Sequence, residues 1–106
     1  MHMITIGNKR TDAPQAGDVY VGRPSPLGNP YVLSRDGDRA TVIARYRRWL
    51  TAQLCEGPGN PAYDACARLF ARAQGQPLRL MCYCAPQACH GEVIVEAMRA
   101  WPPTHY

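Results

Sequence analysis

The sequence predicts a small α/β domain, in which helices pack on a short, mostly parallel sheet. Two observations lead to this class. Short apolar runs typical of strands alternate with longer segments in which apolar residues recur every three or four positions, as in helices. The chain has 106 residues, of which 46% are hydrophobic, and this length supports one modest core. We therefore expect residues 1–106 to form a single α/β domain.

Strands are predicted where apolar runs are bounded by turn residues: residues 3–6, 18–22, 31–33 and 78–83. The last run is apolar on both faces, which favours a central position in the sheet. If this strand is parallel to the strand that ends at Gly22, the loops that follow the two strands meet at one edge of the sheet. Open α/β sheets bind ligands at this carboxyl edge.

Helices are predicted from apolar periodicity at residues 38–54, 61–73 and 89–101. Asp36 or Asp38 can cap the first helix, and Asn60 precedes Pro61 at the start of the second. The apolar stripe of the first helix repeats every four residues: Val42, Tyr46, Leu50 and Leu54. The third helix starts near Cys89 and stops before two prolines.

The net charge of +4 at neutral pH and the pI of about 9.0 favour anionic partners. A small anionic ligand is the expected partner, and nucleic acid is the alternative. Four arginines of the first helix are either its solvated face or a strip that binds nucleic acid: Arg39, Arg45, Arg47 and Arg48. Few aromatic residues are interleaved with them, so base stacking has little support from this helix.

The sequence also predicts a compartment. No apolar run approaches the ~20 residues that span a bilayer, and residues 1–10 lack the apolar segment of a signal peptide. We therefore expect a cytoplasmic protein without a membrane partner. Stable disulfides are rare in the cytoplasm, where clustered cysteines more often indicate metal binding or catalysis.

Three of the five cysteines lie close together in the stretch CYCAPQACHGE, residues 82–92. Cys82 and Cys84 would point to one side of a strand, and Cys89 returns at the start of a helix, so we expect the three sulfurs to gather at this junction. As metal ligands they would hold an iron–sulfur cluster with one open iron, or a zinc ion with His90 as the fourth ligand. The spacing matches no strong metal signature.

A metal-free interpretation rests on Cys89. At a helix N-terminus, its thiol would have a lowered pKa and would be partly exposed next to Gly28 or Asn29. His90 would orient this thiol or accept its proton, which makes Cys89 and His90 the candidate catalytic residues. The amides of the same turn, where Gly91 permits close approach, can hold a phosphate or carboxylate.

A third interpretation needs no chemistry. Free cysteine commonly serves as a small core residue, and the cluster would then be buried packing at a tight turn. We expect this structural role for the two remaining cysteines, Cys55 and Cys66.

The stretch GRPSPLGNP, residues 22–30, contains three prolines that exclude helix and central strand. Arg23 can hold a planar anion with two hydrogen bonds. Ser25 and the amides near Gly28 and Asn29 can donate to phosphate or to a base edge. The alternative is a rigid turn that only connects elements. The predicted ligand-binding residues are Gly22, Arg23, Ser25, Gly28, Asn29 and Gly91.

The stretches VYVGRPSPLGNPY and LRLMCYCAPQACHGEVIVEAM, with the R-Y-x-x-W-L helix between them, resemble the signature segments of a bacterial and phage family, domain of unknown function 4326. The resemblance covers residues 17–98. Members of the family often carry an aromatic residue just before G-N-P, where this chain has Leu27, so base stacking at that position is not expected. The matching positions are Gly22, Arg23, Pro24, Gly28, Asn29, Pro30, Cys82, Cys84, Pro86, Cys89, His90 and Gly91. The resemblance implies a site but no activity.

The leading hypothesis joins the two stretches into one ligand site. It describes an enzyme that acts on a nucleotide, nucleoside or similar small anion, which Arg23 and Asn29 bind and orient. One alternative is a metal or iron–sulfur protein that uses Cys82, Cys84 and Cys89. The other is a nucleic-acid-binding module that uses the arginines of the first helix.

Overall fold

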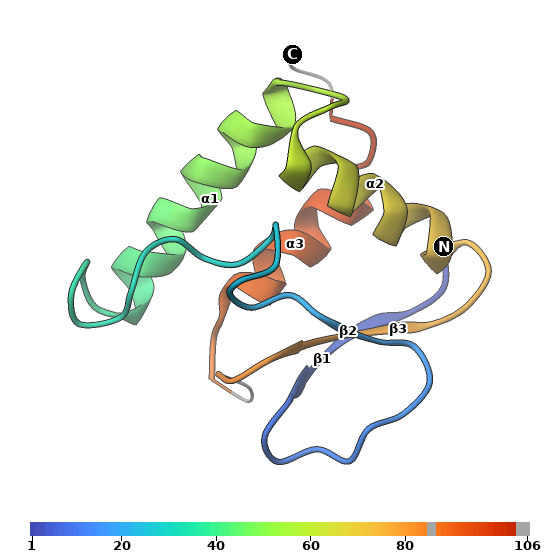
Figure 1. Ribbon diagram of the computed structural model, residues 1–106, viewed down its shortest axis with the longest axis horizontal. Helices are drawn as coiled ribbons and strands as arrows, with labels where there is room; N and C mark the ends of the chain where they lie inside the picture. Colours follow the sequence, from blue (N-terminus) through green and yellow to red (C-terminus); the bar gives the residue numbers. More distant parts are fainter. Residues whose placement is uncertain (85–86, 104–106) are drawn as a thin grey trace.

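The computed structural model describes residues 1–84 and 87–103. Pro86, one of the positions in the resemblance, lies outside the described residues. Three strands and three helices follow each other along the chain: β1 (Ile4–Asn8), β2 (Asp18–Tyr20), α1 (Arg39–Cys55), α2 (Pro61–Ala73), β3 (Leu78–Cys82) and α3 (His90–Arg99). Figure 1 shows the helices together on one side of the sheet and the loop between β1 and β2 on the other side. The predicted α/β class is therefore confirmed.

The sheet has the strand order β1-β3-β2, and both pairings are parallel. The register places Ile4 opposite Leu78 and Asp18 opposite Arg79. The central strand is β3, as its two apolar faces predict. The ends of β2 and β3 therefore lie at the same edge of the sheet, which is the arrangement that the ligand-site prediction requires.

The predicted strand at residues 31–33 is wrong. The backbone N–H of Tyr31 donates to the side-chain oxygen of Asn29 at 2.9 Å, and that of Val32 donates to Asp36 at 2.7 Å. Local side chains thus satisfy the amides that a neighbouring strand would otherwise use. The segment is a turn-rich loop that leads into α1.

The helices begin at the predicted caps. Asp38 accepts a hydrogen bond from the amide of Thr41 at 2.8 Å, and Asn60 accepts from the first amides of α2. Cys89 occupies the N-cap position of α3, and this helix ends at Arg99, two residues earlier than predicted. Within the described ranges, none of the helices combines the length and the apolar character needed to cross a membrane.

Both sides of the sheet are covered. On the helical side, α3 contacts β1 and β3, and α1 and α2 pack against α3. On the other side, the guanidinium of Arg79 donates to both carboxylate oxygens of Asp18, at 2.8 and 2.9 Å, and to the carbonyl of Ala13 at 2.8 Å. The Arg79 hydrogen bonds hold the pKa of the Asp18 carboxyl below its ordinary value. The ion pair joins β2 to β3, and the hydrogen bond to Ala13 fastens the loop between β1 and β2 to the sheet.

Tyr46 connects α1 to the rest of the core. Its side chain is 0% exposed, and its hydroxyl donates to the carbonyl of Leu27 at 2.7 Å. Its ring meets the ring of His90 edge-on at 5.0 Å between centroids. One buried side chain therefore links α1, the proline-rich loop and the start of α3.

The cysteines outside the cluster match their predicted structural role only in part. Cys66 is buried in the core, and burial raises the pKa of its thiol to about 12. Cys55 is half-buried at the last position of α1.

We expect Tyr46→Phe to lower the free energy of unfolding by about 1–3 kcal/mol, because it leaves the buried carbonyl of Leu27 without its donor. Tyr83→Phe is the matched control, since the Tyr83 side chain is 51% exposed. Urea denaturation of both variants measures the difference. Equal effects of the two substitutions would contradict the importance of the buried hydrogen bond.

Candidate functional site

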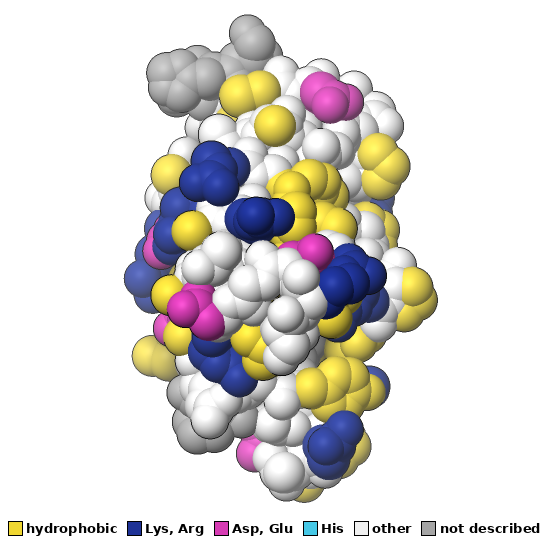
Figure 2. Space-filling model, turned by 90° about the vertical axis from the view of Figure 1, so that its left-hand side faces the viewer, with side chains coloured by type: hydrophobic (Ala, Val, Ile, Leu, Met, Phe, Trp, Pro, Cys, Tyr) yellow, Lys and Arg dark blue, Asp and Glu magenta, His cyan; other side chains and the backbone are white. Residues whose placement is uncertain are grey.

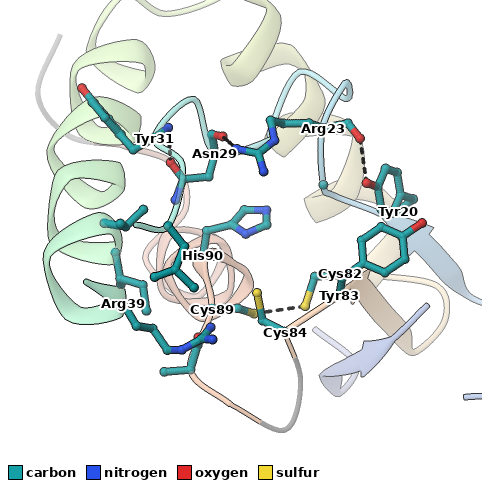
Figure 3. Close-up of a pocket in the computed structure, with 15 residues that line it drawn as sticks. Tyr20, Arg23, Asn29, Tyr31, Arg39, Cys82, Tyr83, Cys84, Cys89 and His90 are labelled. Atoms are coloured by element: carbon teal, nitrogen blue, oxygen red, sulfur yellow. Dashed lines mark hydrogen bonds between the residues drawn. The ribbon is translucent and has the colours of Figure 1, made fainter. Parts of the chain in front are cut away.

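A pocket of about 360 Å³ opens at the carboxyl edge of the sheet (Figure 3). It lies between the ends of β2 and β3, the proline-rich loop and the first turns of α1 and α3. Residues 22–30 and 82–92, which α1 and α2 separate in the sequence, thus contribute to one pocket. Its polar, aromatic and sulfur-containing lining residues, with one glycine, are Tyr20, Gly22, Arg23, Asn29, Tyr31, Arg39, Cys82, Tyr83, Cys84, Cys89 and His90.

Three residues predicted to bind ligand do not line this pocket. Ser25 lines a separate groove of about 220 Å³ beside α2. Gly28 is enclosed within the proline-rich loop. Gly91 lies behind Cys89, where an added Cβ would stand 3.3 Å from the Cys89 sulfur. Gly28 and Gly91 thus lie against the lining residues Arg23 and Cys89, and Ser25 belongs to the other groove.

The proline-rich loop folds back on itself in two successive turns. The amide of Ser25 donates to the carbonyl of Gly22 at 2.8 Å, and the amide of Gly28 donates to the carbonyl of Ser25 at 2.9 Å. Gly28 comes so close to Arg23 that a Cβ on Gly28 would lie 2.9 Å from the Arg23 backbone nitrogen and Cα. This close approach of Gly28 sets the position of Arg23.

Leu27 is buried in the core, so a ligand in the pocket cannot stack on it.

Arg23 and Arg39 give the pocket a positive charge. Arg23 donates through Nη1 to the carbonyl of Asn29 at 3.0 Å, which steadies its guanidinium above the pocket (Figure 3). Arg39 reaches from the first turn of α1 and donates to the carbonyl of Ala88 at 3.1 Å. Each guanidinium has further N–H groups that make no hydrogen bond to the described residues. None of the described lining residues is acidic. The pocket is thus suited to an anion.

His90 is the first residue of α3 and is buried beside the pocket. Its Nε2 lies 2.7 Å from the carbonyl oxygen of Val21. A carbonyl can only accept, so Nε2 carries the proton, and in the neutral ring Nδ1 carries the lone pair. Burial lowers the pKa of His90, which keeps the imidazole neutral at physiological pH. His90 is therefore arranged as a hydrogen-bond or proton acceptor through Nδ1, and its Nε2 hydrogen bond does not reach Cys89.

Two of the three clustered cysteines meet. The sulfurs of Cys82 and Cys89 are 3.2 Å apart, and the two side chains are 1% and 3% exposed. Cys84 lines the pocket but follows β3 in a bend, so strand alternation does not bring it to the pair. The described residues contain no group of three or more histidine, cysteine or acidic side chains that could hold a metal ion. The expected three-sulfur metal cradle is therefore not formed by these side chains.

The prediction of a partly exposed, acidified Cys89 thiol is wrong. Cys89 is buried, and its thiol pKa is raised, first by the hydrogen bond with Cys82 and then by burial. The amide of Gly91 acts in the opposite direction but does not compensate. Two thiolates 3.2 Å apart in a poorly hydrated position would repel each other strongly. Cys89 is therefore a protonated thiol at neutral pH and not an activated nucleophile.

Three tyrosines that were not among the predicted site residues form the aromatic part of the pocket: Tyr20, Tyr31 and Tyr83. Each tyrosine ring has a cation over it. The distance to the ring centroid is 5.4 Å from Lys9 Nζ to Tyr20, 5.5 Å from Arg10 Cζ to Tyr83, and 5.7 Å from Arg45 Cζ to Tyr31. A signal was available, because each tyrosine stands inside or beside one of the two signature stretches. The alternation of side chains along a strand predicts only packing for these tyrosines, and not a place in a pocket.

The arginines of α1 do not act as one strip. Arg39 belongs to the pocket, Arg45 faces Tyr31, and Arg47 pairs with Glu96 at 3.1 Å. Figure 2 shows the basic side chains of this side of the molecule in separate groups, with apolar and uncharged surface between them. The predicted nucleic-acid strip is thus divided among different contacts.

Residues 4–100 match the model of a family described as Domain of unknown function (DUF4326), and the chain belongs to this family. The resemblance drawn from the two signature stretches is therefore confirmed. No curated protein and no solved structure matches the chain.

We expect Gly28→Ala to lower the free energy of unfolding by about 1–3 kcal/mol, because the new Cβ overlaps the backbone of Arg23. Gly75→Ala is the matched control, since the nearest atom to a Cβ there is 3.8 Å away. Urea denaturation compares the two. A Gly28→Ala protein as stable as Gly75→Ala would show that the loop has no such constraint.

His90 predicts a loss of stability in acid. The folded-state pKa lies below the unfolded value of 6.5, so the unfolded chain binds more protons as the pH falls through this value. We expect the free energy of unfolding to decrease between roughly pH 7.5 and pH 5.5. The decrease should be smaller in His90→Gln, which removes the buried imidazole. Parallel pH profiles for the parent and His90→Gln would contradict this assignment.

Proposed function

We propose that the protein is a cytoplasmic enzyme that acts on a nucleotide or a closely related phosphorylated small molecule bound in the pocket of Figure 3. One observation carries the proposal. Two arginines from different elements, Arg23 of the proline-rich loop and Arg39 of α1, reach a single pocket whose described lining has no acidic side chain. The pocket volume of about 360 Å³ lies in the range that small ligands occupy.

The phosphate would lie between the two arginines. They approach the pocket from different sides, with His90 between them in Figure 3. Their unused guanidinium N–H groups can bind phosphate oxygens in pairs. The N-terminus of α3 also lies at this pocket, and the amide dipoles of its first turn favour a negative charge there.

The planar part of the ligand would stack on a tyrosine. Tyr20, Tyr31 and Tyr83 all line the pocket, and each ring is held against a cation. An aromatic ring beside a cation suits a nucleobase, since stacking is insensitive to the base and the charge attracts the phosphate. These residues support a nucleotide over inorganic phosphate alone.

His90 supplies the chemistry in this proposal. Its neutral ring has one nitrogen fixed by Val21 and the other free to accept a proton from a bound water or a ligand hydroxyl. Cys89 lines the pocket but has no role as a nucleophile in this proposal, because a buried, protonated thiol is a weak nucleophile.

The two alternative functions have less support. A metal or iron–sulfur protein needs at least three converging ligands, and the described side chains provide two adjacent sulfurs. A nucleic-acid-binding module needs a continuous basic surface, whereas three of the four α1 arginines, Arg39, Arg45 and Arg47, are engaged in separate contacts.

Calorimetric titration with AMP, GMP, CMP and UMP tests the proposal. We expect at least one of them to bind, with affinity about tenfold or more weaker in Arg23→Ala and in Arg39→Ala, because each change removes charged hydrogen bonds. His90→Gln should bind the same nucleotide within about threefold of the parent and lose turnover, which chromatography of the products detects.

Arg48→Ala is the matched control, since Arg48 is an exposed arginine of α1 that does not line the pocket. Its affinity should equal that of the parent. Equal weakening in Arg48→Ala would indicate nonspecific charge attraction, and the absence of binding to any of the four nucleotides would overturn the proposal.

A further inference from the structure

The sulfurs of Cys82 and Cys89 form a feature that the proposed function does not use. Cys82 is the last residue of β3, and Cys89 is the N-cap of α3, so two elements of regular structure hold the sulfurs. Their separation of 3.2 Å exceeds a disulfide bond of about 2.05 Å by only about 1 Å, a gap that small side-chain rotations close. The pair is thus preorganised for bond formation.

We propose that Cys82 and Cys89 are a reversible modification site, at which a small disulfide of the oxidised glutathione class converts the two thiols into one disulfide bond. This inference does not depend on the nucleotide proposal, because it concerns only the two sulfurs and an oxidant that enters the pocket.

The exchange proceeds in two balanced steps. One sulfur of the pair loses its proton and attacks the oxidant, which breaks the oxidant's S–S bond, forms a mixed disulfide and releases one small thiol. The second sulfur then attacks the cysteine sulfur of this mixed disulfide and releases the other small thiol. Two electrons pass from the cysteine sulfurs to the oxidant, and the two protons end on the released thiols.

Both the access route and the restraint on the reaction follow from the surroundings of the pair. Cys82 and Cys89 line the pocket, which gives a small molecule a path to sulfurs that are otherwise buried. The raised thiol pKa of Cys89 lowers its thiolate fraction at neutral pH, so the exchange is slow there and accelerates as the pH rises. The pair therefore responds to sustained oxidation.

Oxidation would fix one wall of the pocket. The segment between the two cysteines contributes Tyr83, Cys84 and Ala88 to the lining. A bond between Cys82 and Cys89 joins the end of β3 to the start of α3, which reduces the freedom of the unfolded chain. Two adjacent thiols without a third ligand in the described residues suit this reaction better than metal binding.

The test equilibrates the full-length protein with mixtures of reduced and oxidised glutathione, blocks free thiols with iodoacetamide and maps the tryptic peptides by mass spectrometry. Residues 80–99 form one peptide with Cys82, Cys84 and Cys89, and residues 49–68 form another with Cys55 and Cys66 as an internal control. We expect the first peptide to lose two hydrogen atoms and to keep one alkylated cysteine, while the control peptide keeps two.

Variants identify the bonded pair. Cys84→Ser should form the disulfide at the same ratio of oxidised to reduced glutathione as the parent, within about twofold. Cys82→Ala and Cys89→Ala should instead accumulate glutathione adducts. Fragmentation of the parent peptide gives the same assignment even where a variant does not fold. The oxidised parent should also melt ~5 °C or more above the reduced parent. Three alkylated cysteines in the oxidised parent, or loss of the bond in Cys84→Ser, would overturn the proposal.

Discussion

The hydrogen bond from His90 to the carbonyl of Val21 joins the two signature stretches of the chain. Val21 directly follows β2, and His90 begins α3, so this one contact sets α3 against the edge of the sheet where β2 and β3 end. Tyr46 supports this contact, since its ring packs edge-on against His90 and its hydroxyl donates to the carbonyl of Leu27 in the proline-rich loop. The position of Arg23, the tautomer of His90 and the shape of the pocket all depend on this arrangement.

Cys89 illustrates how magnitudes decide between two opposing effects. A helix N-terminus favours a nearby negative charge by about 0.3–1 kcal/mol at exposed positions. Moving a charge out of water costs several kcal/mol, and a second thiol at 3.2 Å adds to that cost. At a residue that is 3% exposed, burial exceeds the dipole, and the thiol stays protonated. A helix N-cap therefore acidifies a cysteine only where water still reaches the sulfur.

Local patterns were sufficient for most of the fold and for the location of the pocket. The caps at Asp38 and Asn60 and the central position of β3 follow from residues a few positions apart. The strand expected at residues 31–33 failed because Asn29 and Asp36 satisfy its amides, which periodicity does not reveal. The directions of the side chains could not be predicted from the sequence either: Ser25 lines another groove, while three tyrosines line the pocket. The two stretches could be predicted to meet, but not which of their atoms face a ligand.

The fixed tautomer of His90 has a consequence for how the pocket handles charge. A proton taken up at Nδ1 creates an imidazolium in a buried position whose described pocket neighbours include two arginines and no carboxylate. An anion in the pocket is then the group that offsets this charge, so proton uptake and anion binding are thermodynamically linked, and each strengthens the other by the same factor. The pocket thus couples the protonation of a histidine to the negative charge of whatever occupies it.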